Sequence, residues 1–522
     1  MIILVIGISL KFYKIDSHYF WYDEICTIMH TSGISDKEYM EKFPENEIKN
    51  ISYYTDLIHL NKQDLTISSQ LAGLSKSTNL NPLHYAMLVF WHRILGDKYL
   101  DYRLFNVFVL FLTLPFLFLF SKLFFKSNLA GWIAITIYSI SPFFQYFTQE
   151  ARYNTLCTLL IVINQYLFFQ SINKNKPKWW TGYALSGILA LYSSFSLGLM
   201  FIGHFIYLLI VERKVLIPFI ISSSLILIGY LPWLISIIQA RSEIFSVLAW
   251  HKAYGVNQNI FTLILAQVYF MAFSFVTFND HISQFNMFIG HQFHGNYIQL
   301  SANILVMALL IYSIVYAIKN AEKKTLWFMA LLILPQFLYF LIYDLVMGTG
   351  VSLFYRYHIL NIIGIILFLV YLLKDKIESG NTFFSGIYFG IITIGIISIL
   401  VMPSNKFLNI FQSYTDDAAV LSGYEKPLLI SDLKKLHWEY NDAAGILAFF
   451  NECKSDKIEV FRVSYNITNI KDYFDARNYS EIVVIGASDE LVANLKSQFG
   501  ERMVQFGVNG SSPKWKIVLK QK

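Results

Sequence analysis

Long apolar runs separated by short polar connections fill most of this chain and limit what it can fold into. A helix of about 20 residues crosses the roughly 30 Å hydrocarbon core of a bilayer. Runs approaching that length recur at 102–120, 129–147, 153–171, 179–193, 196–211, 215–238, 298–318, 326–343, 357–373 and 383–402. Apolar residues make up 55% of the chain and charged residues only 15%, below the roughly 25% of a soluble protein. The sequence therefore predicts a polytopic α-helical membrane protein.

Basic residues gather in alternate connections between these runs. By the positive-inside rule, those connections face the cytoplasm. They contain Lys122 and Lys126; Lys174, Lys176 and Lys178; Arg213 and Lys214; Lys319, Lys323 and Lys324; and Lys374 and Lys376. The apolar stretch 259–278 would reverse this alternation if it crossed the membrane, so we interpret it as interfacial or as half of a re-entrant pair. With a first span at 1–10, we expect about eleven spans, an inside N-terminus and an outside C-terminus.

The first apolar run, 1–10, is short for a span. It lacks the basic start and the small-residue cleavage site of a signal peptide. Either Lys11 and Lys14 extend their side chains to the membrane surface, or the chain starts upstream of Met1.

Two parts of the chain are too polar to lie in lipid. Residues 16–101 are expected to form the first external loop of a transmembrane domain, 1–402. In that loop an apolar segment opens at Pro82 and ends at Leu95-Gly96, which predicts an interfacial helix because about 14 residues are too few to span. Residues 403–522 predict a small extracytoplasmic α/β domain. We expect strands near 428–430, 458–461 and 481–486, and helices at 436–450 and 489–499.

Two polar clusters fall at the outward ends of the predicted spans. Asp23 and Glu24 follow the first apolar run, and Gln149-Glu150-Ala151-Arg152-Tyr153 occupies a short outward turn. Acidic residues beside a bilayer are costly and are often kept for function. Asp23 and Glu24 alone would also suit the cap of an interfacial helix. Arg356 is the basic residue of another short outward turn.

Together these residues suit the transfer of a sugar from a polyprenyl phosphate. A carboxylate would act as general base on the acceptor. An arginine would hold the leaving phosphate through charge-assisted contacts. Such a reaction requires no cofactor; a divalent metal is conceivable, but no ligand pattern in the sequence supports it.

Several motifs, taken in order, resemble bacterial glycosyltransferase family 39, which is related to protein mannosyltransferases and to aminoarabinose transferases of lipid A. The motifs are Trp21-Tyr22-Asp23-Glu24; Asn81-Pro82-Leu83-His84-Tyr85 with Trp91 and Gly96; Tyr102-Arg103-Leu104; Ser141-Pro142-Phe143; Gln149-Glu150-Ala151-Arg152-Tyr153; Leu231-Pro232-Trp233; and Arg356-Tyr357. The resemblance covers roughly residues 1–400. It implies the GT-C fold, with many spans, a first external loop with interfacial helices, and a soluble external domain.

The resemblance also implies roles for single residues. Asp23 would be the catalytic base, with Glu24 assisting. Glu150 and Arg152 would line the same cavity, and Arg356 would face the donor phosphate.

Three further residues, Tyr357, Arg103 and Tyr85, are candidates for substrate binding through the same resemblance. Arg103 would also suit an interfacial anchor at the start of a span. The sequence departs from many relatives at Ser194, where they carry a histidine, so any metal or proton role of that histidine is in doubt. Asn81 replaces the first residue of a doubled proline, which should matter little.

The implied partners are the membrane, a polyprenyl-phosphate sugar donor, and a glycolipid, polysaccharide or protein acceptor. The implied location is a bacterial plasma membrane, with the active site outside. The formal charge of +6 does not indicate nucleic acid, because the basic residues cluster in the connections. A transporter that uses Glu150 and Arg152 as an intramembrane pair is the main alternative. A non-catalytic membrane scaffold is a second alternative, but it leaves both polar clusters unexplained.

Histidines and cysteines give little support for a metal site. His281, His291 and His294 fall in the outward segment 239–297, where structural or solvent-facing histidines fit better than ligands. Cys26, Cys157 and Cys453 have neither metal-ligand spacing nor the pattern of a disulfide framework.

Overall fold

A computed structural model describes residues 2–17, 20–76, 81–241, 251–252, 259–277, 297–402, 412–434, 442–463, 467–506 and 514–518. The chain forms two compact units. The helical unit consists of Met1–Ser17, Thr78–Met87 and Tyr102–Phe407, and the sheet unit of His18–Ser77, Leu88–Asp101 and Leu408–Lys522. The structure thus adds two segments of the first loop to the expected C-terminal domain. His281, His291 and His294 lie outside the described residues.

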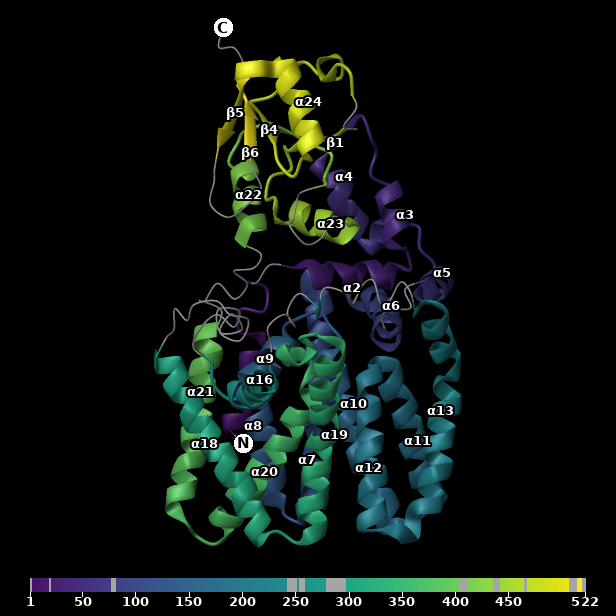
Figure 1. Cartoon of the computed structure of the whole chain (residues 1–522), viewed down its shortest axis with the longest axis vertical. Coiled ribbons are helices and arrows are strands. Elements are labelled where there is room, and N and C mark those ends of the chain that lie inside the picture. Colours follow the sequence, from purple (N-terminus) through teal and green to yellow (C-terminus); the bar gives the residue numbers. More distant parts are fainter. Residues whose placement is uncertain are drawn as a thin grey trace. The chain divides into compact units, whose positions relative to one another are not determined.

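The helical unit is a bundle of apolar helices (Figure 1). Its elements are α1 (Ile2–Ser9), η1 (Leu10–Phe12), α7 (Tyr99–Phe125), α8 (Asn128–Ile140), α9 (Pro142–Thr148), α10 (Asn154–Lys174), α11 (Pro177–Ser193), α12 (Gly198–Ile210), α13 (Leu216–Gln239), α16 (Ile260–Phe273), α18 (Tyr297–Asn320), α19 (Lys323–Met347), α20 (Ile359–Glu378) and α21 (Thr382–Val401). Every expected span therefore coincides with helical structure.

The expected count of eleven spans is not confirmed. Within the described residues, six helices are long and apolar enough to cross a membrane. They are Tyr99–Phe125, Asn154–Lys174, Arg213–Gln239, Tyr297–Asn320, Lys323–Met347 and Thr382–Val401. Helices such as α8 and α12, with 13 residues each, reach only about 20 Å. The 14-residue helix α16 is likewise too short to span alone, which agrees with its exclusion from the span count.

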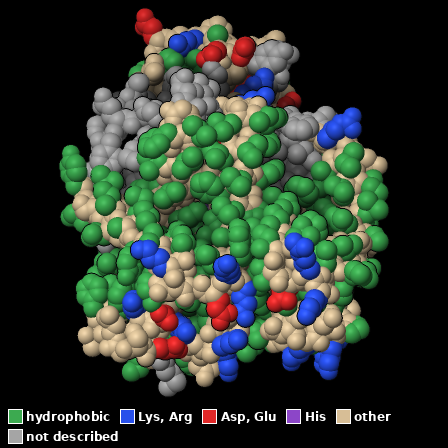
Figure 2. Space-filling view, turned by 60° about the horizontal axis from the view of Figure 1, so that its bottom comes forward, with side chains coloured by type: hydrophobic (Ala, Val, Ile, Leu, Met, Phe, Trp, Pro, Cys, Tyr) green, Lys and Arg blue, Asp and Glu red, His purple; other side chains and the backbone are tan. Residues whose placement is uncertain are grey.

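Lipid-facing and charged surfaces separate along the bundle. The side chains of Ile217, Leu227 and Ile228 on α13 are 62–72% exposed, as expected where lipid replaces water. Figure 2 shows hydrophobic side chains over the flank of the helices, with Lys and Arg side chains gathered toward the lower end. The connections α18–α19 and α20–α21, both flanked by lysines, lie at that end in Figure 1.

Small residues and buried hydrogen bonds join the helices of the bundle. A Cβ on Gly203 would lie 2.3 Å from the carbonyl oxygen of Leu331, so α12 approaches α19 more closely than any larger residue allows. His204 of α12 bonds to the Tyr183 hydroxyl of α11 at 2.9 Å and to Gln165 Oε1 of α10 at 2.8 Å. Such polar contacts between helices help to fix their packing in a membrane.

The N-terminal helix packs inside the bundle. Gly7 of α1 lies so close to α8 that an added Cβ would meet Ser139 Cβ at 2.9 Å. Lys14 is exposed, but Lys11 is fully buried, so the expectation that both lysines extend to a membrane surface is wrong for Lys11. The backbone of this segment is instead tied to other parts of the chain: Gln145 Nε2 donates to the Leu10 carbonyl at 2.8 Å.

The sheet unit contains one six-stranded sheet in the order β1-β3-β2-β4-β6-β5. Its strands are β1 (Glu47–Asn50), β2 (Pro427–Ser431), β3 (Glu459–Arg462), β4 (Glu481–Val484), β5 (Met503–Phe506) and β6 (Lys514–Ile517). β3, β2 and β4 are parallel, and the other pairings are antiparallel. Leu428, Phe461, Ile482, Leu491 and Leu495 belong to its buried core. The three strands expected from sequence are confirmed as β2, β3 and β4.

Helices from both ends of the chain complete this unit. The C-terminal ones are α22 (Gln412–Ser422), α23 (Ala443–Glu452) and α24 (Asp489–Phe499), and the loop contributes α2 (Tyr22–Ser32), α3 (Asp36–Glu41), α4 (Ile51–Thr55), α5 (Ile67–Gly73) and most of α6 (Leu83–Leu95). α24 begins where expected, with the Ser488 hydroxyl accepting from Leu491 N. The helix expected at 436–450 is present from residue 443, and 435–441 lie outside the described residues. In Figure 1 the purple strand β1 and helices α3 and α4 lie beside green and yellow C-terminal elements.

Candidate active site

Asp23 and Glu24 lie in the first turn of α2, in the sheet unit. The partial positive charge of a helix N-terminus favours carboxylates at these positions. The Glu24 side chain is buried and accepts a hydrogen bond from the Trp21 backbone N at 3.4 Å. Asp23 is half-buried, and its carbonyl accepts from the Thr27 hydroxyl at 3.1 Å. The two neighbours therefore differ in burial: Glu24 is buried and caps its own helix, whereas Asp23 is half-buried.

Glu150 and Arg152 lie in the turn between α9 and α10, in the helical unit. Asn106 of α7 organises this turn, because its side-chain amide donates to the carbonyls of Phe147 at 3.4 Å, Arg152 at 2.9 Å and Glu150. Both charged side chains are buried, at 6% and 9% exposure. A buried charge needs compensating partners.

Aromatic and imidazole groups lie beside these two charges. The Tyr146 hydroxyl donates to Glu150 Oε1 at 3.2 Å. The Arg152 guanidinium lies 5.4 Å from the ring centroid of Tyr153, within cation–π range. Burial, and then the charge of Arg152, lower the pKa of His84 to about 3, so His84 is neutral beside the guanidinium.

Arg356 and Tyr357 belong to a short loop between α19 and α20. The loop contains η7 (Val351–Leu353) and η8 (Tyr355–Tyr357). The Arg356 guanidinium lies 5.4 Å from the Tyr357 ring and 5.8 Å from the Phe354 ring. The Tyr357 hydroxyl lies 3.3 Å from His251 Nε2.

A buried carboxylate, Asp344, fixes the start of this loop. Its oxygens accept from the Thr349 hydroxyl at 2.7 Å and from the backbone N of Val351 and Ser352 at 2.8 Å each. His358 Nε2 lies 2.8 Å from the Ser352 carbonyl at the other end. The loop that carries Arg356 is therefore held at both ends.

The Arg356 loop packs against the turn that carries Arg152. The Tyr355 ring lies 5.7 Å from the Phe147 ring and 5.9 Å from the Tyr146 ring of α9. Burial raises the pKa of the Tyr153 hydroxyl, and the nearby charges of Arg152 and Arg356 both oppose this shift. Two arginines from turns 200 residues apart in sequence thus share one neighbourhood of the helical unit.

Arg103 and Tyr85 lie in the helical unit too. Arg103 is only 2% exposed, and its Nη1 donates to the Ile15 carbonyl at 2.8 Å. Its expected role as an interfacial anchor is therefore wrong, because the guanidinium is buried against protein backbone. Tyr85 is also buried, with its ring 5.5 Å from that of His84.

The helical unit thus brings together Glu150, Arg152, Arg356 and Tyr357, whereas Asp23 and Glu24 belong to the sheet unit. A shared cavity for all six stays a prediction. Sequence reasoning missed Asn106, Tyr355, His251 and Asp344 as supporting residues. Only Asp344 had a recognisable signal, as a lone acidic residue at the end of an apolar run. Among the described residues, no group of three His, Cys, Asp or Glu side chains could hold a metal ion.

Comparison with known proteins bears on both the fold and the sequence motifs. Residues 79–236 match the family described as dolichyl-phosphate-mannose-protein mannosyltransferase. A crystal structure of ArnT from Cupriavidus metallidurans bound to undecaprenyl phosphate has a TM-score of 0.54 and 10% identity, over 99% of this chain and 97% of that chain. The apo state of ArnT from the same organism has a TM-score of 0.51 and 11% identity over the same shares. A search of curated proteins finds no significant match.

These matches confirm the expected fold and the expected resemblance. The protein has the GT-C fold seen in ArnT, and residues 79–236 are similar in sequence to the dolichyl-phosphate-mannose-protein mannosyltransferase family.

Proposed function

We propose that this protein is a membrane glycosyltransferase that moves a sugar from a polyprenyl-phosphate donor to an acceptor outside the cytoplasm. It would be a hexosyl- or pentosyltransferase, and the acceptor a glycolipid, a polysaccharide or a protein. The observation that carries the proposal is a GT-C bundle in which Arg152 and Arg356, from two different turns, both lie near Tyr153. A similar bundle, that of ArnT, binds undecaprenyl phosphate.

The proposed reaction is a single inverting displacement. Asp23 takes the proton from the acceptor nucleophile as the nucleophile attacks the anomeric carbon. The bond from that carbon to the phosphate oxygen breaks, and polyprenyl phosphate leaves with the electron pair. Asp23 is half-buried, whereas the Glu24 side chain is buried, and this difference favours Asp23 for the role.

Arg152 and Arg356 would hold the phosphate. Negative charge collects on the leaving oxygen as the bond breaks, so charge-assisted hydrogen bonds from guanidinium strengthen toward the transition state. Glu150, bonded to Tyr146, would balance the buried charge of Arg152. Tyr357, Arg103 and Tyr85 would complete the donor site, and Glu24 would support the acceptor side.

Intact-lipid mass spectrometry of cells with and without the gene tests the function. We expect a polyprenyl-phosphate sugar to accumulate when the gene is deleted, and its mass to identify the sugar. An unchanged lipid profile, together with no loss of sugar from any envelope component, would contradict the proposal.

The base is tested by Asp23→Asn, which keeps the shape of the side chain but cannot accept a proton. Transfer should fall by about two to four orders of magnitude, with donor binding preserved. The matched variant Glu24→Gln should lose much less. If Asp23→Asn transfers sugar at the wild-type rate, the base is another residue, with Glu150 the next to test.

A further inference from the structure

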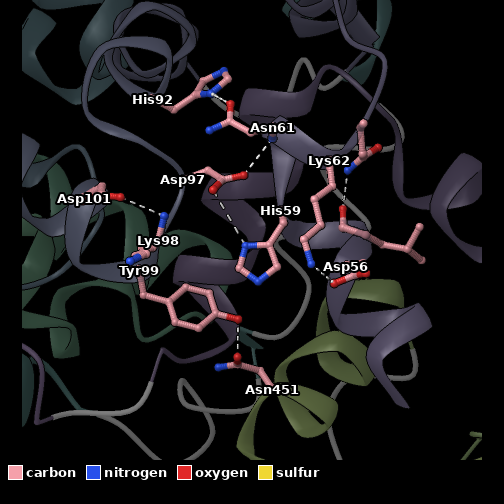
Figure 3. A network of polar contacts seen from close by, with 12 residues as sticks. Asp56, His59, Asn61, Lys62, His92, Asp97, Lys98, Tyr99, Asp101 and Asn451 are labelled. Carbon is pink, nitrogen blue, oxygen red and sulfur yellow. Dashed lines mark hydrogen bonds and ion pairs between the residues drawn. The ribbon is translucent and has the colours of Figure 1, made fainter. Parts of the chain in front are cut away.

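Helix α23 of the C-terminal segment is held at both ends by tyrosines of the first loop. At its N-terminus, Asp442 is the cap: Oδ1 accepts from Gly445 N at 2.9 Å, and Oδ2 accepts from the Tyr22 hydroxyl at 2.6 Å. Near its C-terminus, the Tyr99 hydroxyl donates to Asn451 Oδ1 (Figure 3). Both tyrosines come from parts of the chain more than 340 residues earlier.

Further loop contacts line the same helix. The Ala443 backbone N donates to Asp36 Oδ1 of α3 at 2.9 Å. The Tyr54 ring of α4 lies 4.8 Å from the Phe450 ring. All residues of α23 from Ala443 to Phe450 are buried. Helix α23 is therefore buried inside the sheet unit, and polar groups at both of its ends form hydrogen bonds with the first loop.

A polar network fixes the segment that carries Tyr99. Figure 3 shows Asp97 between two loop groups: its Oδ2 accepts from Asn61 N at 2.7 Å, and its Oδ1 lies 3.9 Å from His59 Nδ1. The next carboxylate, Asp101, accepts from Lys98 N at 2.9 Å. Tyr99 also stacks on Phe20, with ring centroids 4.4 Å apart. Tyr99, which bonds to α23, therefore also contacts Phe20, the residue just before Trp21-Tyr22-Asp23.

Tyr22 is the first residue of α2, directly before Asp23. Burial above all, and then the neighbouring Cys26 and Asp442, raise the pKa of Tyr22 well beyond its usual range. The phenol therefore stays protonated and can donate to Asp442. A hydrogen bond to a charged acceptor is among the stronger contacts available to fix the start of a helix.

We propose that α23 positions α2, and with it the Asp23 carboxylate, through the hydrogen bond from Tyr22 to Asp442. On this view the C-terminal domain supports the catalytic loop, and Tyr22 and Asp442 are positioning residues. The inference rests on the proposed function, because it concerns the residues that position Asp23, the proposed base. It explains why a segment with no catalytic motif is built around a buried helix whose two ends bind the first loop.

The test compares Tyr22→Phe with a matched control. Tyr479→Phe removes a hydrogen bond of the same kind and length, 2.6 Å to Glu459 Oε2, from the same unit but outside α2. The donor is the polyprenyl-phosphate sugar isolated from cells lacking the gene, and the acceptor is their membrane fraction. Each full-length protein is reconstituted in lipid, and kcat, KM for the donor lipid and the melting temperature are measured.

We expect both variants to lose similar thermal stability, and only Tyr22→Phe to lose kcat, by about tenfold, with KM for the donor unchanged. Misplacement of a catalytic group by about 1 Å can lower a rate up to a hundredfold, so tenfold is a moderate loss. Asp442→Ala, which removes the acceptor of the Tyr22 hydroxyl, should behave like Tyr22→Phe.

Asp23→Asn and the wild type are measured alongside. If Asp23→Asn loses turnover while Tyr22→Phe and Tyr479→Phe keep the same kcat, the positioning role is wrong and the proposed function stands. An equal loss of kcat in both tyrosine variants also overturns the inference, because it would reflect stability alone. If the wild type itself transfers no sugar from the isolated lipid, the proposed function fails whatever the tyrosine variants do.

Discussion

At the scale of the residue, side chains of the same type differ in the groups that they contact. Arg103 and Arg152 are both buried arginines at helix ends, yet Arg103 donates to the Ile15 carbonyl, whereas Arg152 lies beside Tyr153 and the neutral imidazole of His84. Arg152 and Arg356 both lie near Tyr153, at the contact between the two turns, whereas Arg103 contacts the N-terminal segment. We therefore rank Arg152 and Arg356 ahead of Arg103 as phosphate ligands.

Replacing either ranked arginine should weaken use of the donor. A hydrogen bond to a charged partner contributes about 1.5–3 kcal/mol, so Arg152→Ala and Arg356→Ala should each raise KM for the donor lipid roughly tenfold to a hundredfold. Arg356→Lys should recover little of this if the contact is bidentate. Arg213→Ala, which lies in the connection between α12 and α13, serves as the control. Normal donor affinity in both alanine variants would place the phosphate elsewhere, with Arg103 next to test.

His92 makes the stability of the sheet unit sensitive to acid. Its Nδ1 lies 3.3 Å from Asn61 Oδ1, and burial, then the charge of Arg93, lower its pKa to about 4 from an ordinary 6.5. Between these two values the unfolded chain binds a proton at His92 that the folded chain does not bind. The free energy of unfolding therefore decreases as pH falls from 6.5 to 4. We expect His92→Gln to flatten the fall in melting temperature over that range. Parallel curves for His92→Gln and wild type would contradict this.

At the scale of the element, the loop between α19 and α20 depends on one carboxylate. Asp344 uses both oxygens to accept three hydrogen bonds, from Thr349, Val351 and Ser352. An asparagine has only one accepting oxygen and would present an amide to a backbone donor. The loop that presents Arg356 should therefore loosen when Asp344 is changed.

Asp344→Asn should lower the free energy of unfolding by about 1–3 kcal/mol, the cost of leaving a buried donor without its acceptor. The melting temperature of the protein in detergent measures this. Glu322→Gln, which changes an exposed carboxylate at the other end of the same helix, is the control and should have little effect. Equal melting temperatures for Asp344→Asn and Glu322→Gln would mean that the loop is held by other contacts.

At the scale of the whole molecule, the alternation of basic connections predicts which side each part of the chain faces. Lys174–Lys178 and Lys323–Lys324 should lie inside, and residues 16–101 and 403–522 outside. Lys176 and Lys471 are both exposed in the structure, so cysteines at these positions are accessible to a label. We expect a membrane-impermeant thiol reagent to label Lys471→Cys but not Lys176→Cys in intact cells, with Cys26, Cys157 and Cys453 replaced by serine. The reverse labelling would invert the topology and remove Asp23 from the outer face.

Much of this protein could be predicted from local sequence. Apolar runs near helix length placed the bundle, because burial in lipid requires every backbone group to bond within its own segment. Short strand-like runs near 428–430, 458–461 and 481–486 placed β2, β3 and β4, and the helix expected at 489–499 is α24. The two turns with Glu150, Arg152 and Arg356 were likewise found from isolated charges among apolar residues.

The tertiary structure decided what these pieces join. No local pattern indicates that Glu47–Asn50 pairs with Glu459–Arg462, that Tyr22 bonds to Asp442, or that Tyr355 packs on α9. The number of helices long enough to span the membrane could also not be predicted from the apolar runs, because runs such as 129–147 break into two shorter helices at Ser141-Pro142. Hydropathy and capping act over a few residues and are written in the sequence itself. Pairing across 400 residues depends on which buried surfaces and polar groups satisfy one another, and only the folded chain settles that.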